Sequence, residues 1–352
     1  GVSRLAALHP NESDIRMDYL ADFFLRFLVQ FQSPTLGFLI GGMLIAALGS
    51  KLKIPNAIYQ FIVFMLLMKI GLNGGIEIRE ANLLAMALPA FFSILIGLAI
   101  VRVGIAIFGL LPGINKADGF ATAGLFGAVS ASTLAVAIVA LEEESIAFEA
   151  WAPALYPFMD IPALILAIVM ANIHMKKEQN GGEEANVNVW GIVKESLRGS
   201  ALSALLLGLA LGLFTNSGSV LDSFYEPLFR GFLSILMLIM GMEAYDRIKE
   251  LRSVAHWYAI YAGFAPLLHG FIAFGLGYIA HLLVGFSPGG VIILSVIASS
   301  NSDISGPPTL RAGIPSANPS SYIGASTSVG TPVAIAVGIP LFIALAQIVF
   351  EL

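Results

Sequence analysis

The sequence predicts an all-α, polytopic membrane protein whose ten transmembrane helices form two inverted five-helix repeats. Three observations lead to this fold class. First, 57% of the 352 residues are hydrophobic and only 12% are charged, whereas about 25% of the residues of a soluble domain are charged. Second, the chain contains a series of apolar stretches long enough to cross a bilayer. Third, its two halves resemble each other.

Ten stretches approach the length of about 20 apolar residues that a membrane-spanning helix requires. The last two are interrupted by proline and glycine. Ahead of the ten, the segment 20–32 mixes polar residues with phenylalanines and predicts an interfacial helix. The cores of the ten stretches lie near residues 35–49, 56–72, 83–109, 118–140, 150–173, 193–214, 228–244, 255–284, 288–310 and 320–349.

The two halves of the chain correspond at a constant spacing. MDIPALI (159–165) aligns with VGTPVAI (329–335) at an offset of 332 − 162 = 170 residues, and the same offset aligns FGAVSAST (126–133) with VIASSNSD (296–303). Each half holds five predicted helices, which is an odd number. The second copy must therefore cross the membrane in the opposite sense, as in many secondary transporters.

This pattern divides the chain into an N-terminal extension or cloning remnant at 1–16, a first repeat at 17–173, a connecting loop at 174–192 and a second repeat at 193–352. Basic residues favour the cytoplasmic side of a membrane. We therefore expect a multi-pass protein of the plasma (inner) membrane with both termini outside and the loop inside. Twelve of the 18 Lys and Arg residues then lie on the cytoplasmic side: Lys51, Lys53, Arg102, Lys116, Lys176, Lys177, Lys194, Arg198, Arg247, Lys249, Arg252 and Arg311.

The segment from Val291 to Gly313 is polar where a membrane helix should be apolar. It contains hydroxyls, an amide, Asp303 and the pair Pro307 and Pro308. A charge at bilayer depth costs a few kcal/mol even on lenient scales, so it normally faces a cavity, a partner or a substrate path. Proline lacks the N–H that a helix interior needs, which frees backbone carbonyls for other partners. The segment predicts a broken helix that surrounds an ion.

Repeat symmetry predicts that the broken helices four and nine cross near the membrane midplane. Half-helix N-termini offer N–H groups to an anion there, and unwound carbonyls suit a small cation. Asp160, ahead of Pro162 in the fifth helix, reads equally well as a helix cap or as a ligand. Hydroxyls at 326–331, ahead of Pro332 in the tenth helix, line the same region.

Other polar residues have ordinary structural readings. We expect Asp118 to be the N-cap of the fourth helix, Glu243 and Asp246 to belong to a solvated charge network, and Lys69 to extend to the membrane interface. His269 is expected to be a satisfied structural residue. The chain has no cysteine, and its five histidines are scattered, so thiolate or transition-metal centres are not expected.

Four segments are long and unusual in composition: SSNSDISGPPTLRAGIPSANPSSYIGASTSVGTP, GLFGAVSAST, ALYPFMDIPA and FRGFLSILMLIMGMEA. They closely resemble the cyanobacterial-type sodium-dependent bicarbonate transporters, and the resemblance covers nearly everything from Met17 onward. It implies a Na⁺/HCO₃⁻ symporter, not an enzyme, that accumulates inorganic carbon for a CO₂-concentrating mechanism. It also implies a homotrimer inhibited by a PII-like protein, although the central loop, at 174–188, is shorter than is usual in the family.

The hypothesis that follows has Na⁺ as the coupling ion, no other cofactor and no nucleic-acid partner. A core of helices three to five and eight to ten would move against a gate of helices one, two, six and seven, by analogy at the level of the fold. The Na⁺ ligands expected are Asp303, Ser130, Ser132, Thr133, Ser302, Thr327 and Asp160, with carbonyls near Gly306 and Pro307. The bicarbonate ligands expected are Ser132, Thr133, Ser300, Asn301, Ser302, Ser305 and Gly306, with the N–H groups after Ser132 and after Ser302.

Three other functions remain to be separated from this one. A sodium symporter of another small anion would have the same helix breaks. A cation/proton antiporter could use Asp160 and Asp303 as its two membrane carboxylates. An intramembrane aspartyl protease also needs two aspartates, but the chain lacks the Gly-x-Gly-Asp context, and a general acid/base pair would not need the hydroxyl cluster.

Overall fold

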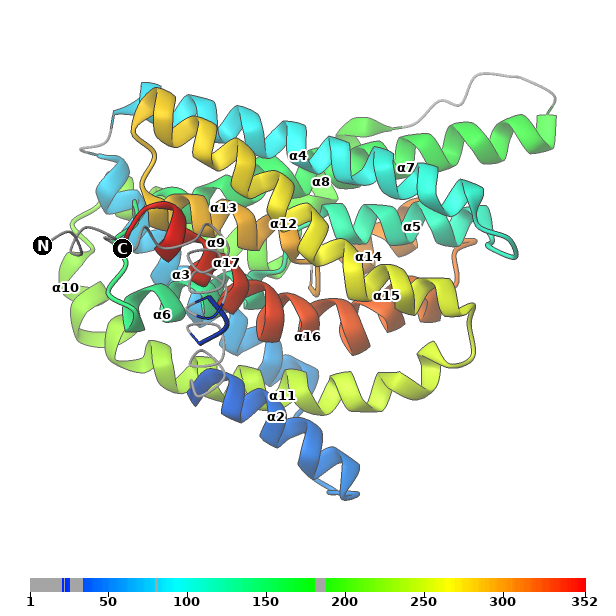
Figure 1. The fold of residues 1–352 in the computed structure, drawn as a ribbon, viewed down its shortest axis with the longest axis horizontal. Coiled ribbons are helices and arrows are strands. Elements are labelled where there is room, and N and C mark those ends of the chain that lie inside the picture. Colours follow the sequence, from blue (N-terminus) through cyan, green and yellow to red (C-terminus); the bar gives the residue numbers. More distant parts are fainter. Residues whose placement is uncertain (1–20, 22, 26–33, 80–81, 181–187, 305) are drawn as a thin grey trace, which may run out of the picture.

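The computed structural model describes residues 21, 23–25, 34–79, 82–180, 188–304 and 306–352, and these residues form helices and connecting loops without a β-strand (Figure 1). The extension expected at 1–16 and most of the interfacial helix expected at 20–32 lie outside the described residues.

Within the described residues, seven helical stretches are long and apolar enough to cross a membrane. Three shorter apolar helices occupy the places of the first, sixth and ninth expected spans: α2 (Pro34–Ala47), α9 (Ser200–Phe214) and α13 (Pro288–Ser299). The seven long stretches are α3 (Asn56–Ile78), α4 (Leu83–Leu110), α5 (Lys116–Gly127) with α6 (Ala131–Glu143), η1 (Ala152–Leu155) with most of α7 (Tyr156–Asn180), α10 (Gly218–Val220) with η2 (Leu221–Tyr225) and α11 (Glu226–Leu251), α12 (His256–Val284), and the segments from α15 to α17. An all-helical, multi-pass membrane protein is therefore confirmed.

Helix extends into the range expected to be a loop at 174–192. The helix α7 continues to Asn180, and α8 (Val189–Arg198) precedes α9 as a separate helix. The sequence between 174 and 180 contains neither proline nor glycine, so nothing in it stops a helix that has already formed. A glycine, Gly199, separates α8 from α9 and is the N-cap residue of α9.

Three of the expected spans are interrupted. The fourth stops at Gly127 and resumes at Ala131. The ninth stops at Ser299 and resumes in α14 (Gly306–Gly313). The tenth remains helical but contains two wide turns around Pro332, in which the backbone bonds run from residue i+5 to residue i. Its segments are α15 (Pro319–Ala325), η3 (Ser326–Gly330), α16 (Thr331–Val333), η4 (Ala334–Gly338) and α17 (Ile339–Val349).

Glycines allow two pairs of helices to pack at very short distance. The helix α2 packs on α11, and α3 packs on α9. In the first pair, a Cβ added to Gly42 would collide with the main chain at Leu238. In the second pair, a Cβ on Gly71 would lie 2.9 Å from the Cα atom of Gly208. Small residues at such positions are typical of helix contacts in membranes.

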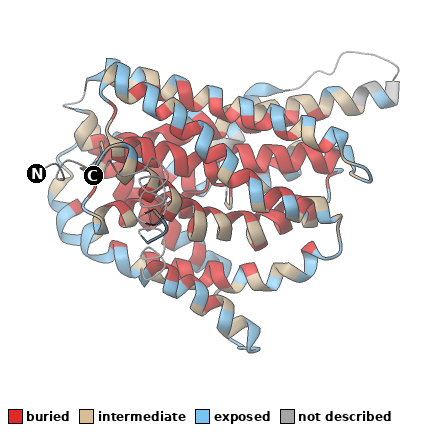
Figure 2. Ribbon diagram, viewed as in Figure 1, coloured by how far each residue is buried: buried red, intermediate tan, exposed pale blue. Residues whose placement is uncertain are grey.

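The remaining helices surround a deeply buried centre. The helix α4 packs on α5 and α7, and α12 packs on α13. Nearly every residue of α5, α6 and α13 is buried. Figure 2 shows these buried residues along the middle of the molecule and the exposed residues along its outer helices. The two interrupted spans therefore lie inside the protein, where irregular backbone can find partners.

Candidate functional site

The two helix breaks meet at a direct hydrogen bond. The backbone N–H of Ser130 donates to the hydroxyl of Ser300 at 2.9 Å. A second bond links the same regions, from the N–H of Ser302 to the carbonyl of Leu125 at 3.0 Å. All four residues are buried, and each is at most 1% exposed. The crossing of the fourth and ninth expected spans thus brings together serines that are 170 residues apart in the sequence.

The first break is held by its own side chains and by Asp160. Ser130 is the N-cap of α6, and its hydroxyl oxygen accepts from the N–H of Thr133 at 3.1 Å and from the Thr133 hydroxyl at 2.9 Å. The N–H of Val129 donates to Asp160 Oδ1 at 2.9 Å. Asp160 is fully buried in α7, and its other oxygen has no partner among the described residues. Asp160 therefore acts on the unwound backbone as a cap.

The second break is longer and begins with serine caps. The Ser300 hydroxyl donates to the carbonyl of Ile297 at 2.7 Å while it accepts from the first break. The Ser302 hydroxyl accepts from the N–H of Gly306 at 2.8 Å, where α14 begins. Ser305 lies outside the described residues. These bonds fix both ends of the break and leave its middle residues, Asn301 and Asp303, to interact with other helices.

Asp303 is the charged residue of the crossing, and it joins three helical segments. Its Oδ2 atom accepts from the hydroxyl of Ser132, in the first turn of α6, and from the Tyr59 hydroxyl of α3 at 3.2 Å. Its Oδ1 atom is buried and has no hydrogen-bond partner in the described part of the chain. An unpaired carboxylate oxygen in a buried site is costly, so this atom is available to a further partner.

A small cavity of about 30 Å³ adjoins Asp303. This volume holds about one water molecule. Oxygen atoms from hydroxyls and carboxylates suit hard cations. The polar residues at its wall are Asp303, Tyr59, Glu243, Thr327 and Thr331.

The side chain of Asn301, in the second break, contacts the wide turn of the tenth span. Its Oδ1 atom accepts from the hydroxyls of Ser326 and of Thr331, the latter at 2.8 Å. Its Nδ2 atom is buried without a partner in the described residues. A Cβ added to Gly330 would lie 2.8 Å from that nitrogen. Glycine at 330 therefore allows the wide turn to close around the amide.

The structure brings most of the expected ligands to one place but changes two of their roles. Ser130, Ser132, Ser300, Asn301, Ser302, Asp303 and Gly306 meet at the crossing, and Thr327 lines the adjoining cavity. The expected anion donors after Ser132 and after Ser302 need correction, because α6 already begins at Ala131 and α14 only at Gly306. The N–H of Thr133 bonds Ser130, and that of Gly306 bonds Ser302. The first-turn N–H groups of Ala131 and Ser132 remain without an intrahelical partner.

Two residues of the site were missed in the sequence. Tyr59 and Glu243 belong to α3 and α11, and both line the cavity beside Asp303. Glu243 is exposed, which agrees with the solvated position expected for it, but it also lines the cavity, which the sequence did not indicate. Tyr59 is 244 positions away from Asp303 in the sequence, and only the packing of α3 against the crossing brings them together. Its one signal was its own hydroxyl, near the start of a membrane-spanning helix.

Asp118 is not the N-cap of the fourth span. Asn115 has that position, and its side chain accepts from the N–H of Ala117 at 2.9 Å. The carboxylate of Asp118 instead accepts from the N–H of Asn318 at 2.7 Å and from the Ser321 hydroxyl at 2.8 Å. It therefore caps the start of α15, a helix 200 residues later in the chain.

Lys69 does not extend to an interface alone. Its nitrogen lies 3.4 Å from Glu142, 3.1 Å from Glu226 and 4.4 Å from the ring centre of Phe229. The side chain is 4% exposed, so burial and pairing replace the solvent that a free ammonium needs.

Among the described residues, no group of three or more His, Asp or Glu side chains could hold a metal ion. Single carboxylates, together with hydroxyls and carbonyls, are therefore the groups available as cation ligands.

The fold and this polar crossing define a class of protein: a multi-pass membrane protein with interrupted helices around a buried, charged centre, as in ion-coupled transporters. The chain belongs to the Na⁺-dependent bicarbonate transporter superfamily, whose family model matches residues 34–347. No individual curated protein matches the chain. The matched range includes both helix breaks and the cavity beside Asp303. The resemblance noted in the sequence is thereby confirmed, and transport, not catalysis, is the function of the family.

Proposed function

We propose that the protein is a symporter that uses the Na⁺ gradient to take up HCO₃⁻. The observation that carries the proposal is the carboxylate of Asp303. It lies in the second break, accepts a hydrogen bond from Ser132 in the first, and retains one buried oxygen without a partner in the described chain. Na⁺ binds there, with the hydroxyls of Ser132 and Thr327 and with carbonyls freed at the break. Ser130 and Ser302 support this site as caps.

Bicarbonate binds next to the ion, where hydroxyls and helix-start N–H groups converge. The N–H groups of Ala131 and Ser132 are the first-turn donors of α6, and helix N-termini favour anions. The Nδ2 of Asn301 is a further buried donor without a partner in the described residues. Ser300 completes the set from the second break. Thr133 and Gly306 act indirectly, since their N–H groups are already bonded to serines.

Coupling follows from the sign of the charges. Without Na⁺, the carboxylates of Asp303 and Glu243 repel bicarbonate. Two like charges 4 Å apart repel by about 4 kcal/mol at an effective dielectric constant of 20, which corresponds to roughly a thousandfold in affinity. Na⁺ at Asp303 removes most of that repulsion, so it binds first and the anion follows.

The ten spans form two inverted repeats, and several features support this arrangement. Ser130 and Ser300, which bond at the crossing, are themselves 170 residues apart. Gly42 and Gly212, and likewise Gly71 and Gly241, are separated by the same 170 residues, since 212 − 42 = 241 − 71 = 170. These glycines lie at the α2–α11 and α3–α9 contacts, which the repeat would interchange. A gate of α2, α3, α9 and α11 then moves against a core of the other helices.

The cellular setting is also proposed. Both termini lie outside and the segment at 174–192 lies inside a plasma (inner) membrane, in accord with the distribution of basic residues. Three copies assemble, a PII-like protein regulates them from the cytoplasm, and the imported bicarbonate supplies a CO₂-concentrating mechanism. These assignments rest on the resemblance to the family.

The direct test is uptake of ¹⁴C-bicarbonate into proteoliposomes that contain the purified protein, at alkaline pH and with an inward Na⁺ gradient. We expect accumulation that disappears when K⁺ replaces Na⁺ and in liposomes without protein. Excess small carboxylic acids or bile-acid-like anions added outside should leave this uptake unchanged. Inhibition by one of them, with no transport of bicarbonate, would assign the protein to another anion. A pH-sensitive dye inside the vesicles tests the antiporter, which predicts Na⁺-driven proton flux without inorganic carbon.

A further inference from the structure

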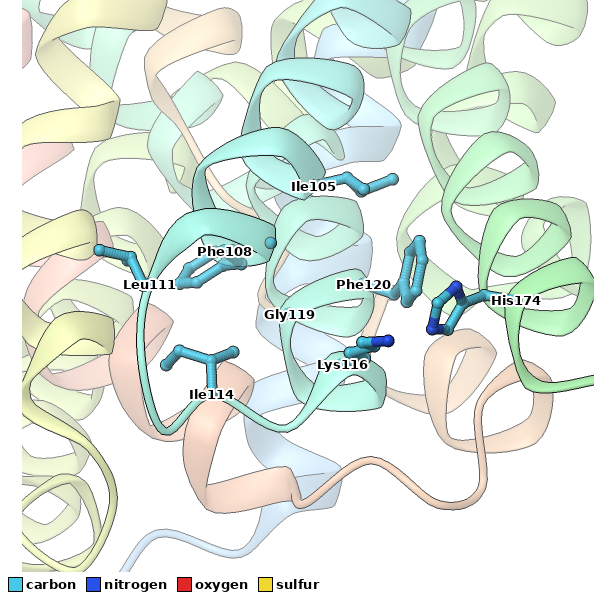
Figure 3. Close-up of a pocket in the computed structure, with 9 residues that line it drawn as sticks. Ile105, Phe108, Leu111, Ile114, Lys116, Gly119, Phe120 and His174 are labelled. Atoms are coloured by element: carbon cyan, nitrogen blue, oxygen red, sulfur yellow. The ribbon is translucent and has the colours of Figure 1, made fainter. Parts of the chain in front are cut away.

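A second, larger cavity shares no lining residue with the cavity beside Asp303 and is mostly apolar. Its volume is about 370 Å³, within the range of roughly 300–1,000 Å³ that is usual for ligand pockets. Most of its wall is apolar, from Ile105, Phe108 and Leu111 of the α4 end to Phe120 of α5. The only ionisable groups among its described lining are Lys116 and His174. Figure 3 shows these two side by side at one end of the cavity, with Ile105 at the other.

The cavity lies at the level where three spans end. The span of α4 ends at Leu110, the span of α5 and α6 begins at Lys116, and the span of α7 ends at Met175. The residues that line the cavity come from these three ends. Its apolar part therefore faces the edge of the hydrocarbon layer, and its basic part faces the region of the lipid headgroups.

The basic groups at the cavity share a single carboxylate. The nitrogen of Lys116 lies 3.0 Å from Glu178 Oε1, and His174 Nε2 lies 3.3 Å from the same oxygen. The side chains of Lys116 and Glu178 are both 58% exposed, and an ion pair so open to solvent contributes little to stability. The hydrogen bond from Lys116 holds the pKa of Glu178 below its usual range. A phosphate group can replace this carboxylate at little cost.

A further basic residue lies on the face of α4 that lines the cavity. Arg102 is three residues from Ile105 and seven from Gly109, which places the three on one side of the helix. Arg102 is exposed and forms no ion pair with any described residue. It lies about two turns before the end of α4, so its charge needs either a long reach to water or an anionic partner at the protein surface.

Two glycines at the cavity have different roles: Gly109 leaves open space, and Gly119 allows close packing. A Cβ added to Gly109 would meet nothing within 4 Å. By contrast, a Cβ on Gly119 would lie 2.9 Å from that of Phe108, so α5 packs tightly on α4 at the floor of the cavity. Space next to Gly109 is therefore a local feature and does not reflect loose packing of the whole region.

We propose that this cavity binds an anionic membrane phospholipid, with one acyl chain between α4 and α5 and its phosphate at Lys116. The apolar wall accounts for the chain, and the basic residues at the headgroup level account for the charge. The site is independent of transport, since none of its residues lies at the Asp303 crossing.

The test measures the lipids that remain bound to the purified full-length chain. The protein in detergent is incubated with equal amounts of phosphatidylglycerol and phosphatidylethanolamine of identical acyl composition, and bound lipids are counted by native mass spectrometry. We expect the protein to retain phosphatidylglycerol in preference. Lys116→Ala should lower its retention about fivefold, the effect of one basic residue at an anionic surface. Glu178→Gln should raise it, because Lys116 and His174 are then released from the carboxylate.

Two further variants test separately the space for the acyl chain and the position of the basic residue. Gly109→Phe fills the open space without a change in charge and should reduce retention of both lipids at this site. Lys53→Ala removes an exposed basic residue outside the cavity and should have no effect, with unaltered size-exclusion profiles as the check on folding. Equal retention of the two lipids by the unmodified protein would overturn the proposal. So would a loss in Lys53→Ala as large as that in Lys116→Ala, or full retention in Gly109→Phe.

Discussion

The two helix breaks occupy corresponding places in the sequence, but their polar groups are used differently. The first break is short, from 128 to 130, and carries no charge. Its N–H at Val129 is satisfied by Asp160, and its N-cap Ser130 satisfies Thr133. The second break, described from 300 to 304, contains Asp303 and an amide whose nitrogen has no partner in the described residues. The polar groups within the first break are bonded, whereas the second break presents a carboxylate oxygen and an amide nitrogen without partners in the described residues.

The comparison is sharpest at one pair of positions. Thr133 and Asp303 are separated by the repeat offset of 170 residues, since 303 − 133 = 170. Thr133 directs both its N–H and its hydroxyl back to Ser130. Asp303 instead accepts from Ser132 and Tyr59, on other segments. At this pair of positions the second break therefore carries a carboxylate that reaches other segments, while the first break carries a hydroxyl that bonds within its own segment.

The largest effect is expected from Asp303→Asn. The amide has nearly the same shape and can still accept from Ser132, but it has no charge to hold Na⁺. Loss of a buried, hydrogen-bonded charge at a binding site costs about 2–5 kcal/mol, so Na⁺-stimulated bicarbonate uptake in proteoliposomes should fall at least about thirtyfold. Normal size-exclusion and thermal-unfolding profiles would show that the fold is retained.

Thr133→Val is the matched control at the corresponding position of the first break. It removes a hydroxyl that bonds only Ser130 within the described chain, so coupling to Na⁺ should persist. If Asp303→Asn transported with an unchanged dependence on Na⁺, the assignment of charge to the second break would be wrong. If Thr133→Val abolished the Na⁺ dependence instead, the two breaks would have the opposite roles.

The next effect is expected at Ser132, whose hydroxyl joins the breaks. A hydrogen bond to a charged group contributes about 1.5–3 kcal/mol, so Ser132→Ala should raise the Na⁺ concentration needed for half-maximal uptake by about tenfold or more.

Ser302→Ala removes the cap of α14 and should lower stability by about 1 kcal/mol, with a weaker apparent affinity for bicarbonate. Concentration series in both substrates separate these outcomes. Normal transport by both variants would place the anion site elsewhere.

Much of this centre could be predicted from the sequence, because the rule behind it is local. A run of serines with Asp303 beside Pro307 and Pro308 cannot continue a membrane helix without a reason, and the 170-residue offset identifies its counterpart around Ser130. The same local reasoning failed where partners come from distant segments. Asp118 caps a helix 200 residues away and not its own, since a carboxylate near one helix start can serve any N–H group that packing brings to it.

Tyr59 and Glu243 were missed for the same reason. Each lies in an α-helix that satisfies its backbone fully, and nothing in the surrounding residues signals a ligand. Their part in the site depends on how α3 and α11 pack against the crossing, which is set by close helix contacts such as that between Gly71 and Gly208. Sequence pattern locates a break in a helix, whereas the wall opposite the break is a property of the assembled fold.

A smaller effect should distinguish the two readings of Asp160. As a cap, it needs an oxygen that accepts from Val129, and an asparagine provides one. Asp160→Asn should therefore keep uptake within about threefold of the original and leave the Na⁺ dependence unchanged, while Asp160→Ala should lower the unfolding temperature, since loss of a cap costs about 0.5–2 kcal/mol. A Na⁺ affinity that falls in Asp160→Asn as far as in Asp303→Asn would identify a second cation ligand on the first break.

The smallest effect is expected at Tyr59, which lies on α3, outside both breaks, and contacts the second one. Its hydroxyl donates to Asp303 at 3.2 Å, a longer distance than that of a strong charge-assisted bond. Tyr59→Phe keeps the ring packed and removes this one donor, so the apparent Na⁺ affinity should weaken by only about two- to fivefold, the lower end for a single hydrogen bond. A loss as large as that of Ser132→Ala would mean that the α3 hydroxyl, and not the first break, is the main partner of the charge. The crossing would then be a scaffold, and the site would lie between the second break and the helices packed against it.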